Sequence, residues 1–586
     1  MINVVEASIA DLAAALAEGR TTAVELVDAH LARIDAYDGP DTETKLNAVV
    51  VRNPDALAEA RASDARRAAG QARGLLDGIP YTAKDSYMVR GLTVAAGSPA
   101  FADLVATDDA FTIARLRAAG AICLGLTNMP PMANGGMQRG VYGRAESPYN
   151  ADFLTSAFAS GSSNGSGTAT AASFGVFGLG EETWSSGRAP AACNGLCAYT
   201  PSRGMISVRG NWPLVPTMDV VVPHTRSMAD LLAVLDVIVA DDPETRGDFW
   251  RAQPWVPLPS VDEVRPPSFA ALAGRPSLKG KRIGIPRMFL GDDPLAGTGT
   301  RGVGGPTGES IELRPSLREL FDIARADLEA AGAIAVDCDF PLVSNYEGDR
   351  PGAPTIRTRG LVSDEFLHRE IVDLSAWAWD DFLRGTGHSG LATVDGAAIF
   401  PHPEGALPDR YTGFDDDISL YPSHVREHPV GSFSEIPALA EGVRGLEETR
   451  RRDLEEWMDA NGFAAVVFPT LSDVAPADAD VNEASADIAW RNGVWVATGN
   501  LAIRHCGVPT VTVPLGTMPD IGMPAGVTFA GRAYDDAALL SMAAVFEALR
   551  PRRTGPPRTP PLEVKRPDEA WGHDPHSAGR LARPSA

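Results

Sequence analysis

The sequence predicts an α/β fold in which α-helices surround a central mixed β-sheet. Short apolar segments alternate along the chain with longer segments whose apolar residues recur at helical spacing, and this alternation is typical of a sheet covered by helices. The chain has 586 residues, of which 44% are hydrophobic and 22% charged, as in soluble globular proteins. These proportions predict a substantial buried core.

Capping residues and periodicity predict the individual elements. Ser8 and either Thr21 or Thr22 are candidate N-caps of two helices within residues 8–38. Further helices are expected at 54–67, 111–119, 166–174 and 434–460. Strands are expected at 46–51, 79–83, 122–126, 176–179 and 464–468, with more regular elements between 485 and 549.

One domain is predicted for residues 1–550, followed by a tail. Residues 551–586 are rich in Pro and Arg with few large apolar residues, which predicts disorder. The glycine-rich segment 291–308 is expected to be a mobile surface loop. Nucleotide binding is not expected there, because the segment lacks the Lys-Ser/Thr ending of a phosphate-binding loop. Residues 340–440 are the least regular part, and their aromatic cluster at 377–382 either lines a pocket entrance or forms an amphipathic helix packed on the sheet.

Charge and cysteine content exclude several classes of function. The net charge of −24 argues against nucleic acid or an anionic membrane surface as a partner. The five cysteines are scattered, which favours buried thiols in a reducing compartment, and Cys193-x-x-x-Cys197 has no second pair with which to hold a metal. There is no leader-like segment and no long uncharged apolar stretch, so a cytoplasmic protein without a membrane partner is expected.

Three motifs carry the candidate chemistry. They are GIPYTAKD at 78–85, SGSSNGSG at 160–167 and GEETWSSGRAP at 180–190. Ser186 supplies a hydroxyl nucleophile, Ser162 a second hydroxyl that can relay its proton, and Lys84 an amine that can accept it. Together they predict an acyl-transfer site that is built without histidine.

These motifs resemble those of the amidase signature family. The family patterns are G-(I/V)-P-x-x-x-K-(D/E), G-G-S-S-G-G-S and G-(T/S)-(D/E)-x-G-G-S-(I/V)-R-x-P, and the core motifs fall within residues 78–210. The resemblance covers nearly the whole chain and extends to residues 109–128, 500–514 and 531–549. It implies the amidase signature fold, and it places the 340–440 segment where family members vary and shape their substrate pockets.

The resemblance also implies the activity. It points to an amidohydrolase that cleaves the C–N bond of a small-molecule amide, needs no cofactor or metal, and allows for a homodimer. By position it makes Ser186 the nucleophile, Ser162 the relay serine and Lys84 the base of a Ser–cis-Ser–Lys triad. The peptide bond before Ser162 is accordingly expected to be cis.

The resemblance further assigns the loop around the nucleophile. It implies an oxyanion hole made by the backbone N–H groups of Thr183, Trp184 and Ser185, and supporting roles for Ser163, Glu182 and Arg188. Trp184-Ser185 replaces the usual Gly-Gly, Gly187 the usual Ile or Val, and Asn164 a glycine. A conformation open only to glycine would be strained at Trp184. Arg188 is expected to pair with Glu182 or, alternatively, to meet a substrate carboxylate.

Lys84 can act as a base only when it is neutral. Since a free lysine has a pKa of about 10.4, burial at the end of the apolar strand must lower the pKa of Lys84. An inward-facing Asp85 would raise it, so the Asp85 side chain is expected to point away.

Two other functions remain open at this point. One is the glutaminase subunit of a tRNA-dependent amidotransferase, against which the long 340–440 segment and the tail weigh. The other is a catalytically impaired binding protein, if Trp184-Ser185 disrupts the oxyanion hole. A histidine triad through His224 or His505 is not expected, because neither histidine lies in the context of a G-x-S-x-G nucleophile elbow.

Overall fold

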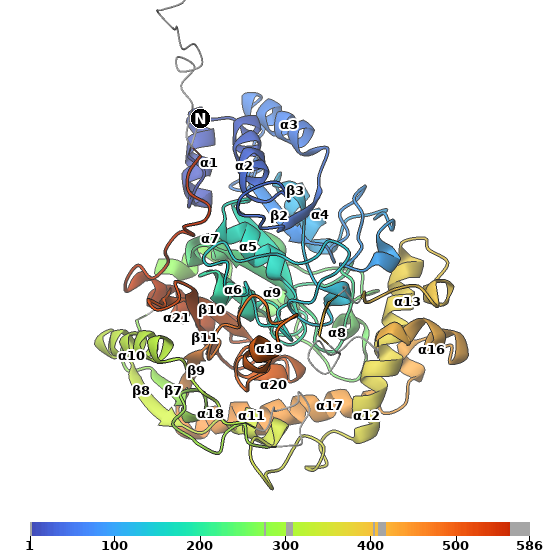
Figure 1. The fold of residues 1–586 in the computed structure, drawn as a ribbon, viewed down its shortest axis with the longest axis vertical. Helices are drawn as coiled ribbons and strands as arrows, with labels where there is room; N and C mark the ends of the chain where they lie inside the picture. Colours follow the sequence, from blue (N-terminus) through green and yellow to red (C-terminus); the bar gives the residue numbers. More distant parts are fainter. Residues whose placement is uncertain (1–2, 275–276, 300–308, 402–404, 408–417, 563–586) are drawn as a thin grey trace, which may run out of the picture.

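The computed structural model describes residues 3–274, 277–299, 309–401, 405–407 and 418–562. These residues form an eleven-stranded sheet in the order β1-β3-β2-β4-β6-β5-β10-β11-β9-β7-β8, covered by helices (Figure 1). The strands are β1 (Val49–Arg52), β2 (Pro80–Lys84), β3 (Ile122–Thr127), β4 (Phe177–Glu182), β5 (Cys197–Thr200), β6 (Val220–Thr225), β7 (Arg282–Pro286), β8 (Ile334–Cys338), β9 (Phe463–Pro469), β10 (Thr510–Thr517) and β11 (Pro524–Ala530). The β2–β3, β2–β4, β7–β8 and β7–β9 pairs are parallel and the other pairs antiparallel, so the predicted mixed α/β sheet is confirmed.

Helices surround this sheet. They are α1 (Ile9–Ala17), α2 (Ala23–Tyr37), α3 (Ala56–Ala68), α4 (Phe111–Ala118), α5 (Asn164–Ala171), α6 (Arg188–Cys193), α7 (Met228–Ile238), α8 (Phe249–Ala252), α9 (Val261–Val264), α10 (Pro315–Ala330), α11 (Pro341–Glu347), α12 (Asp364–Arg369), α13 (Ser375–Gly385), α16 (Tyr421–Glu427), α17 (Leu439–Arg450), α18 (Glu456–Asn461), α19 (Glu483–Ala489), α20 (Asn500–His505) and α21 (Asp536–Ala548). Ser8 and Thr22 each form a capping box, with Asp11 and Glu25 respectively, and so start α1 and α2 as their sequence predicts.

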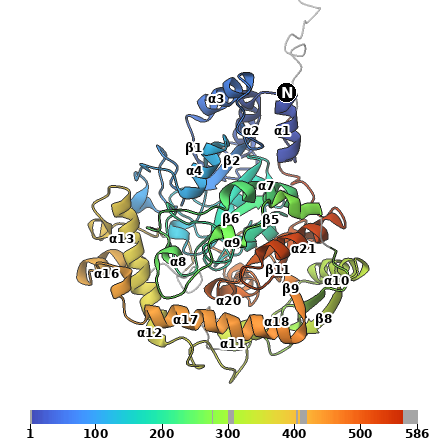
Figure 2. The same ribbon diagram turned by 180° about the vertical axis from the view of Figure 1, so that it is seen from behind.

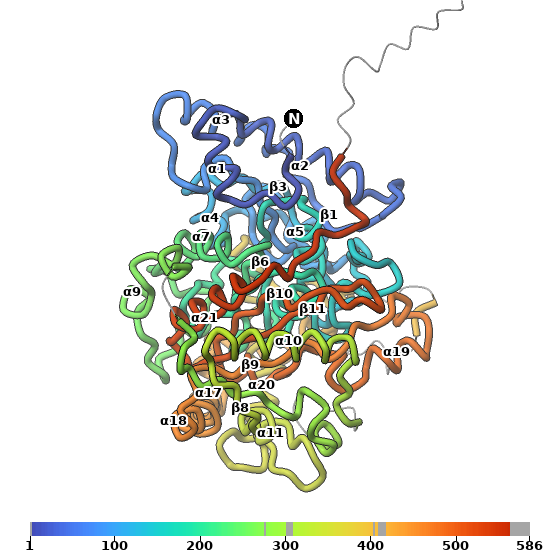
Figure 3. Tube along the Cα trace, turned by 90° about the vertical axis from the view of Figure 1, so that its left-hand side faces the viewer, coloured from blue at the N-terminus to red at the C-terminus, as the bar shows by residue number. Residues whose placement is uncertain are grey.

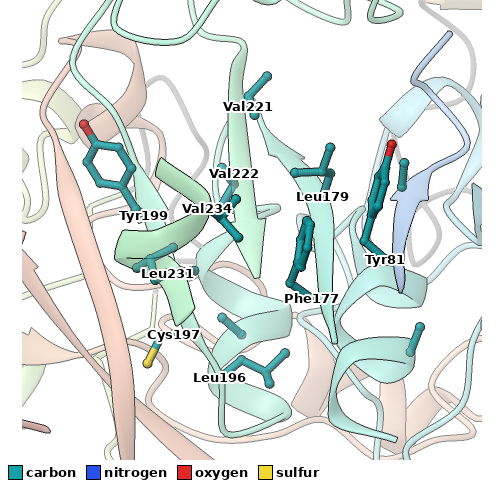
Figure 4. Packing of buried hydrophobic residues seen from close by; sticks show 14 of the residues in the cluster. Tyr81, Phe177, Leu179, Leu196, Cys197, Tyr199, Val221, Val222, Leu231 and Val234 are labelled. Atoms are coloured by element: carbon teal, nitrogen blue, oxygen red, sulfur yellow. The ribbon is translucent and has the colours of Figure 1, made fainter. Parts of the chain in front are cut away.

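The centre of the sheet is buried on both faces. Tyr81 on β2 stacks on Phe177 on β4, with their ring centroids 5.1 Å apart, and Leu179 and Val222 continue the same apolar layer (Figure 4). Every residue of β2 is buried, as is usual for a strand with parallel neighbours. A polar side chain at the end of such a strand therefore enters a dry environment.

The 340–440 segment is more regular than its sequence predicts. It contains α11, α12, α13, α16 and the start of α17, and α12 and α13 are joined by a π-helical turn, η5 (Glu370–Leu374). The helices are short, so their apolar periodicity is weak in the sequence. Viewed from behind, α17 and α18 run along one edge of the molecule with α12 at the end of α17, while α13 and α16 lie to one side (Figure 2).

The aromatic cluster at 377–382 lies in α13, which confirms its helical interpretation. Its rings contact side chains outside the strands, however. Trp379 is buried against Trp212 and Tyr421, with ring centroids 5.9 and 5.0 Å away. Trp377 contacts Phe433. The helix thus packs on loops and on α16 rather than on the sheet.

The expected disordered tail from residue 551 is wrong for residues 551–562. This segment runs from α21 toward the N-terminal helices (Figure 3). Arg553 pairs with Glu6 at 2.7 Å and donates to the carbonyls of Asn194 and Gly195, and Arg33 donates to the Pro560 carbonyl. Buried arginine contacts of this kind order a segment that has few large apolar residues. Residues 563–586 lie outside the described residues, as do 300–308 of the glycine-rich loop.

The five cysteines are free thiols, four of them buried and Cys338 partly exposed. Within the described ranges, no group of three His, Cys, Asp or Glu side chains could hold a metal ion. In the same ranges, no helix has the length and apolar character needed to cross a membrane.

Candidate active site

Lys84 is the last residue of β2, and Ser186 follows β4, its parallel neighbour. Because the carboxyl ends of parallel neighbours meet at one edge of a sheet, the two motifs come together there. Lys84 is completely buried, and its Nζ donates to Ser162 Oγ at 2.6 Å.

Ser162 lies in the loop before α5 and contacts both other members of the predicted triad. Its hydroxyl accepts from Lys84, and its backbone N–H donates to Ser186 Oγ at 3.0 Å. The neighbouring Ser163 hydroxyl bonds to both the N–H and the carbonyl of Glu181, which fixes the serine loop to β4.

The predicted cis bond before Ser162 is not present. None of the described peptide bonds is cis, so the Gly161–Ser162 bond is trans. With this bond trans, the Ser162 hydroxyl reaches Lys84 and its amide reaches Ser186. The contact between Ser162 and Ser186 is therefore made by the Ser162 amide and not by its hydroxyl.

Glu182 and Arg188 brace the nucleophile loop, and the expected pairing is confirmed. Arg188 Nε donates to Glu182 Oε1 at 2.9 Å, and the N–H groups of Gly187 and Arg188 donate to Oε2 at 3.0 and 2.9 Å. The rest of the guanidinium donates to the carbonyls of Trp184, Thr498 and Asn500. The pair is fully buried and its polar atoms are used within the protein, so Arg188 holds the loop rather than a substrate carboxylate.

The loop around Ser186 accommodates the residues that depart from the family pattern. Thr183, Trp184 and Ser185 are not among the residues with positive φ, so Trp184 needs no glycine-only conformation. The Ser185 N–H donates to Ser160 Oγ at 3.2 Å. A Cβ added at Gly187 would lie 2.6 Å from Val222 Cγ1, so Val222 fills the volume that a branched residue would need there.

Burial and the nearby carboxylates act on the pKa of Lys84 in opposite directions. Burial lowers the pKa of Lys84, and the nearby Glu181 carboxylate, with weaker contributions from Asp219 and Glu182, acts in the opposite direction. Asp85 points away, as expected: its carboxylate accepts from the Gly97 N–H at 2.9 Å, and burial raises its pKa to about 7.

Comparison with known proteins identifies the family of this chain. The sequence profile of the family described as Amidase matches residues 25–298. The A subunit of glutamyl-tRNA(Gln) amidotransferase from Cereibacter sphaeroides is 30% identical over 93% of this chain and 97% of its own length. The chain belongs to the amidase signature family.

Further relatives agree with this assignment. The same amidotransferase subunit from Bordetella avium is also 30% identical, over 91% of this chain and 94% of its own. The crystal structure of peptide amidase from Stenotrophomonas maltophilia aligns with a TM-score of 0.67 at 26% identity, covering 94% of this chain and 98% of that one. This amidase-family chain is an enzyme that acts on amide C–N bonds.

Glu181 is a residue of the site that the sequence analysis missed. Its Oε2 lies 3.7 Å from Lys84 Nζ, and its carboxylate accepts from the Ser86 hydroxyl and the Asn211 amide. Burial raises the pKa of Glu181, and Lys84 opposes that shift. The third family pattern has Thr or Ser where this chain has Glu181. That departure from the pattern was the sequence feature that could have pointed to this residue.

A cavity of about 250 Å³ adjoins Ser186, the predicted nucleophile. Ser186, Thr183 and Trp184 line it on the side of the catalytic motifs. The 340–440 segment forms much of the facing wall, through Arg357, Leu367, Glu370, Ile371 and Tyr421. The segment that the resemblance expects to shape the substrate pocket thus lines this cavity, and its role toward a substrate stays a prediction.

The two histidines have structural partners. His224 bonds to Ser166 Oγ at 3.0 Å and to the Gly187 carbonyl at 2.9 Å, and burial lowers its pKa to about 4. His505 lines the cavity but bonds to Tyr346 and Glu370. Both ring nitrogens of each histidine are thus engaged away from the serine pair, in agreement with the expectation that neither forms a triad.

Proposed function

We propose that this chain is an amidohydrolase that cleaves a small carboxamide through an acyl-enzyme on Ser186. One observation carries the proposal: Ser162 joins a buried lysine to Ser186, through its hydroxyl on one side and its backbone N–H on the other. The cavity beside Ser186 gives a carbonyl carbon access to its hydroxyl.

The proposed reaction accounts for each proton. Ser186 Oγ attacks the carbonyl carbon while its proton passes to Ser162 Oγ and the Ser162 hydroxyl proton passes to neutral Lys84. This step requires the two serine hydroxyls to approach each other, because Ser186 Oγ accepts from the Ser162 amide in this structure. When the C–N bond breaks, the relay reverses and protonates the departing amine. A water molecule then attacks the acyl-enzyme by the same route, releasing the carboxylic acid and free Ser186.

The developing oxyanion requires donors in the nucleophile loop. Backbone N–H groups of Thr183, Trp184 and Ser185 are the proposed donors. The Ser185 N–H already donates to Ser160 Oγ at 3.2 Å, so it would have to be shared with the substrate. The N–H groups of Thr183 and Trp184 complete the proposed set of oxyanion donors.

Covalent labelling tests this proposal without knowledge of the natural substrate. A fluorophosphonate should inactivate the protein and leave one adduct, which peptide mass spectrometry should locate on Ser186. An adduct on Ser162 or Ser163 would reassign the nucleophile. The absence of any adduct would support the alternative of a catalytically impaired binding protein, against which the ordinary φ angles of Trp184 and Ser185 already weigh.

A second candidate is the amide-hydrolysing component of a tRNA-dependent amidotransferase. The relatives named as the A subunit of glutamyl-tRNA(Gln) amidotransferase, which align over almost their whole length, favour it. They also leave the expected exclusion of a nucleic-acid partner unsupported. Hydrolysis of amides by the purified chain alone would favour the amidohydrolase, whereas glutaminase activity only with a copurifying partner and tRNA would favour the amidotransferase component.

A further inference from the structure

A chain of hydrogen bonds runs behind the cavity wall and ends on Glu370. The Tyr346 hydroxyl, from α11, lies 2.6 Å from His505 Nδ1, and His505 Nε2 lies 3.0 Å from Glu370 Oε1. The Thr217 hydroxyl donates to the same oxygen. A histidine that carries its proton on Nε2 and accepts from Tyr346 explains both ring contacts without a proton on the carboxyl group.

The second oxygen of this carboxylate is left open. Glu370 is 1% exposed, and its Oε2 has no hydrogen-bond partner among the described residues. Leaving a buried carboxylate oxygen unsatisfied is costly, so such an atom commonly marks a ligand contact. Glu370 lines the same cavity as Ser186 and begins the π-helical turn η5, a type of irregularity often found at functional sites.

Many of the side chains that line the cavity together with Glu370 are apolar. Its neighbours in the wall include the apolar side chains of Leu214, Met218, Leu367 and Leu501. The cavity also touches Arg357, which is exposed and pairs with Asp364 at 2.8 Å. Since none of the described side chains donates to Glu370 Oε2, a ligand in the cavity can supply that donor.

We propose that Glu370 is a specificity-determining residue that binds an ammonium group on the acyl part of the substrate. The preferred substrates would then be amine-bearing carboxamides rather than purely aliphatic ones. This inference rests on the proposed function, since it places the reacting amide at Ser186 in the same cavity. A charge-assisted hydrogen bond in a buried site should favour the amine-bearing substrate by about 10- to 100-fold.

Matched substrates test the inference. We suggest ω-aminoalkanamides of increasing length, each compared with the amide in which a methyl group replaces the ammonium. At the best length, kcat/KM should favour the amine by the factor above in the wild type, and Glu370→Gln should remove that preference while retaining hydrolysis of the methyl-terminated amides. Glu365→Gln, on the exposed side of the preceding helix, is the control and should leave the preference unchanged.

The outcomes separate this inference from the proposed function. If the wild type shows no preference at any length, or Glu370→Gln retains it, Glu370 does not bind an ammonium group. Fluorophosphonate labelling of both proteins reports on Ser186 independently. Labelled proteins without an amine preference overturn only the Glu370 inference, whereas unlabelled wild-type protein overturns the proposed function.

A different observation concerns the carboxylate beside the lysine. Glu181 on β4 faces Lys84 at the end of the neighbouring β2, at 3.7 Å, where the family pattern has an uncharged Thr or Ser. The groups that surround the pair are Ser86 and Tyr87 after β2, Asn211 and Asp219 before β6, His224 on β6, and the adjacent Glu182. Lys84 supplies the amine of this group, and Glu182 pairs with Arg188.

We infer that Glu181 is a positioning residue that faces Lys84 and opposes the loss of its proton, so that activity begins at higher pH than it would without this carboxylate. A carboxylate at this distance favours the charged form of a lysine. The inference rests on the proposed base role of Lys84. It treats Glu181 as acting through Lys84 and not on the substrate.

The pH dependence of fluorophosphonate labelling tests this role. Removing the carboxylate lowers the pKa of Lys84, so the ascending limb of the rate should move to lower pH by about one unit or more in Glu181→Gln and Glu181→Thr. Glu181→Asp should largely restore the wild-type midpoint. A purely structural role would reduce the rate without moving the midpoint, and an unchanged midpoint in a labelled, folded variant would overturn the inference.

Discussion

The catalytic edge of the sheet and the facing cavity wall are built in different ways. At the edge, Lys84, Ser162 and Ser186 bond to one another, and the nucleophile loop is braced by the saturated Glu182–Arg188 pair. In the wall, Glu370 is held through one oxygen while the other remains open. The first region is organised for one reaction, and the second retains a binding capacity that a ligand can use.

Two adjacent carboxylates on β4 show the same difference on a smaller scale. Glu182 accepts from Arg188 and from two backbone N–H groups, and it serves the loop. Glu181 faces Lys84 and two neutral donors. Neighbouring residues on a strand point to opposite faces, so two identical side chains can have separate roles.

The largest expected effect comes from removing the nucleophile at the catalytic edge. Ser186→Ala should lower amide hydrolysis by at least about 10⁴-fold, because no acyl-enzyme can form. Kinetics on a panel of small amides, with fluorophosphonate labelling in parallel, measures the effect. Activity within a factor of about ten of the wild type would move the nucleophile elsewhere.

Removing the base should have the next largest effect. Lys84→Ala should lower kcat/KM on amides by about 10³-fold or more, and by less on activated esters, whose leaving groups need no proton. Equal losses on both substrate types would restrict Lys84 to activating the nucleophile.

The wild-type pH profile follows from the same lysine. Burial lowers the pKa of Lys84 from its ordinary value, and only the neutral amine accepts a proton. The value of kcat/KM should therefore rise with pH through this lowered pKa and level off above it. A profile that falls over the same range would contradict a neutral lysine base.

The brace of the catalytic edge can be broken without touching the triad. Arg188→Met leaves Glu182 buried without its cation, and should cost about 3–5 kcal/mol of unfolding free energy. Urea denaturation provides the measurement. The exposed Arg20–Glu18 pair supplies the control, since Arg20→Gln should cost less than about 1 kcal/mol. Similar losses in the two variants would mean that the buried pair does not brace the loop.

The smallest effect is expected in the cavity wall. Ile371→Ala enlarges the cavity beside Glu370 and should lower kcat/KM for well-fitting apolar amides by about tenfold, the scale of a few methylene contacts. Labelling of Ser186 should remain within about twofold of the wild-type rate. A large loss of labelling would show that the wall also supports the catalytic edge.

Many local elements and the three motifs follow from the sequence alone. Ser8 and Thr22 start their helices through capping boxes, and the buried strand before Lys84 is evident from its apolar run. Such signals depend on a few neighbouring residues, so they can be found without the fold. Lys84, Ser162 and Ser186 could be identified as candidate site residues for the same reason, since each lies in a short local motif.

The groups that face those motifs depend on the tertiary fold. Glu370 meets His505 across 135 positions of sequence, and Glu181 meets Lys84 across neighbouring strands; no local pattern encodes either contact. The contacts of segment 551–562 likewise come from distant partners. Contacts of this kind form only when long loops close and water is excluded. A buried charge or hydroxyl then needs a hydrogen-bond partner, and packing of the whole chain decides which group is near enough.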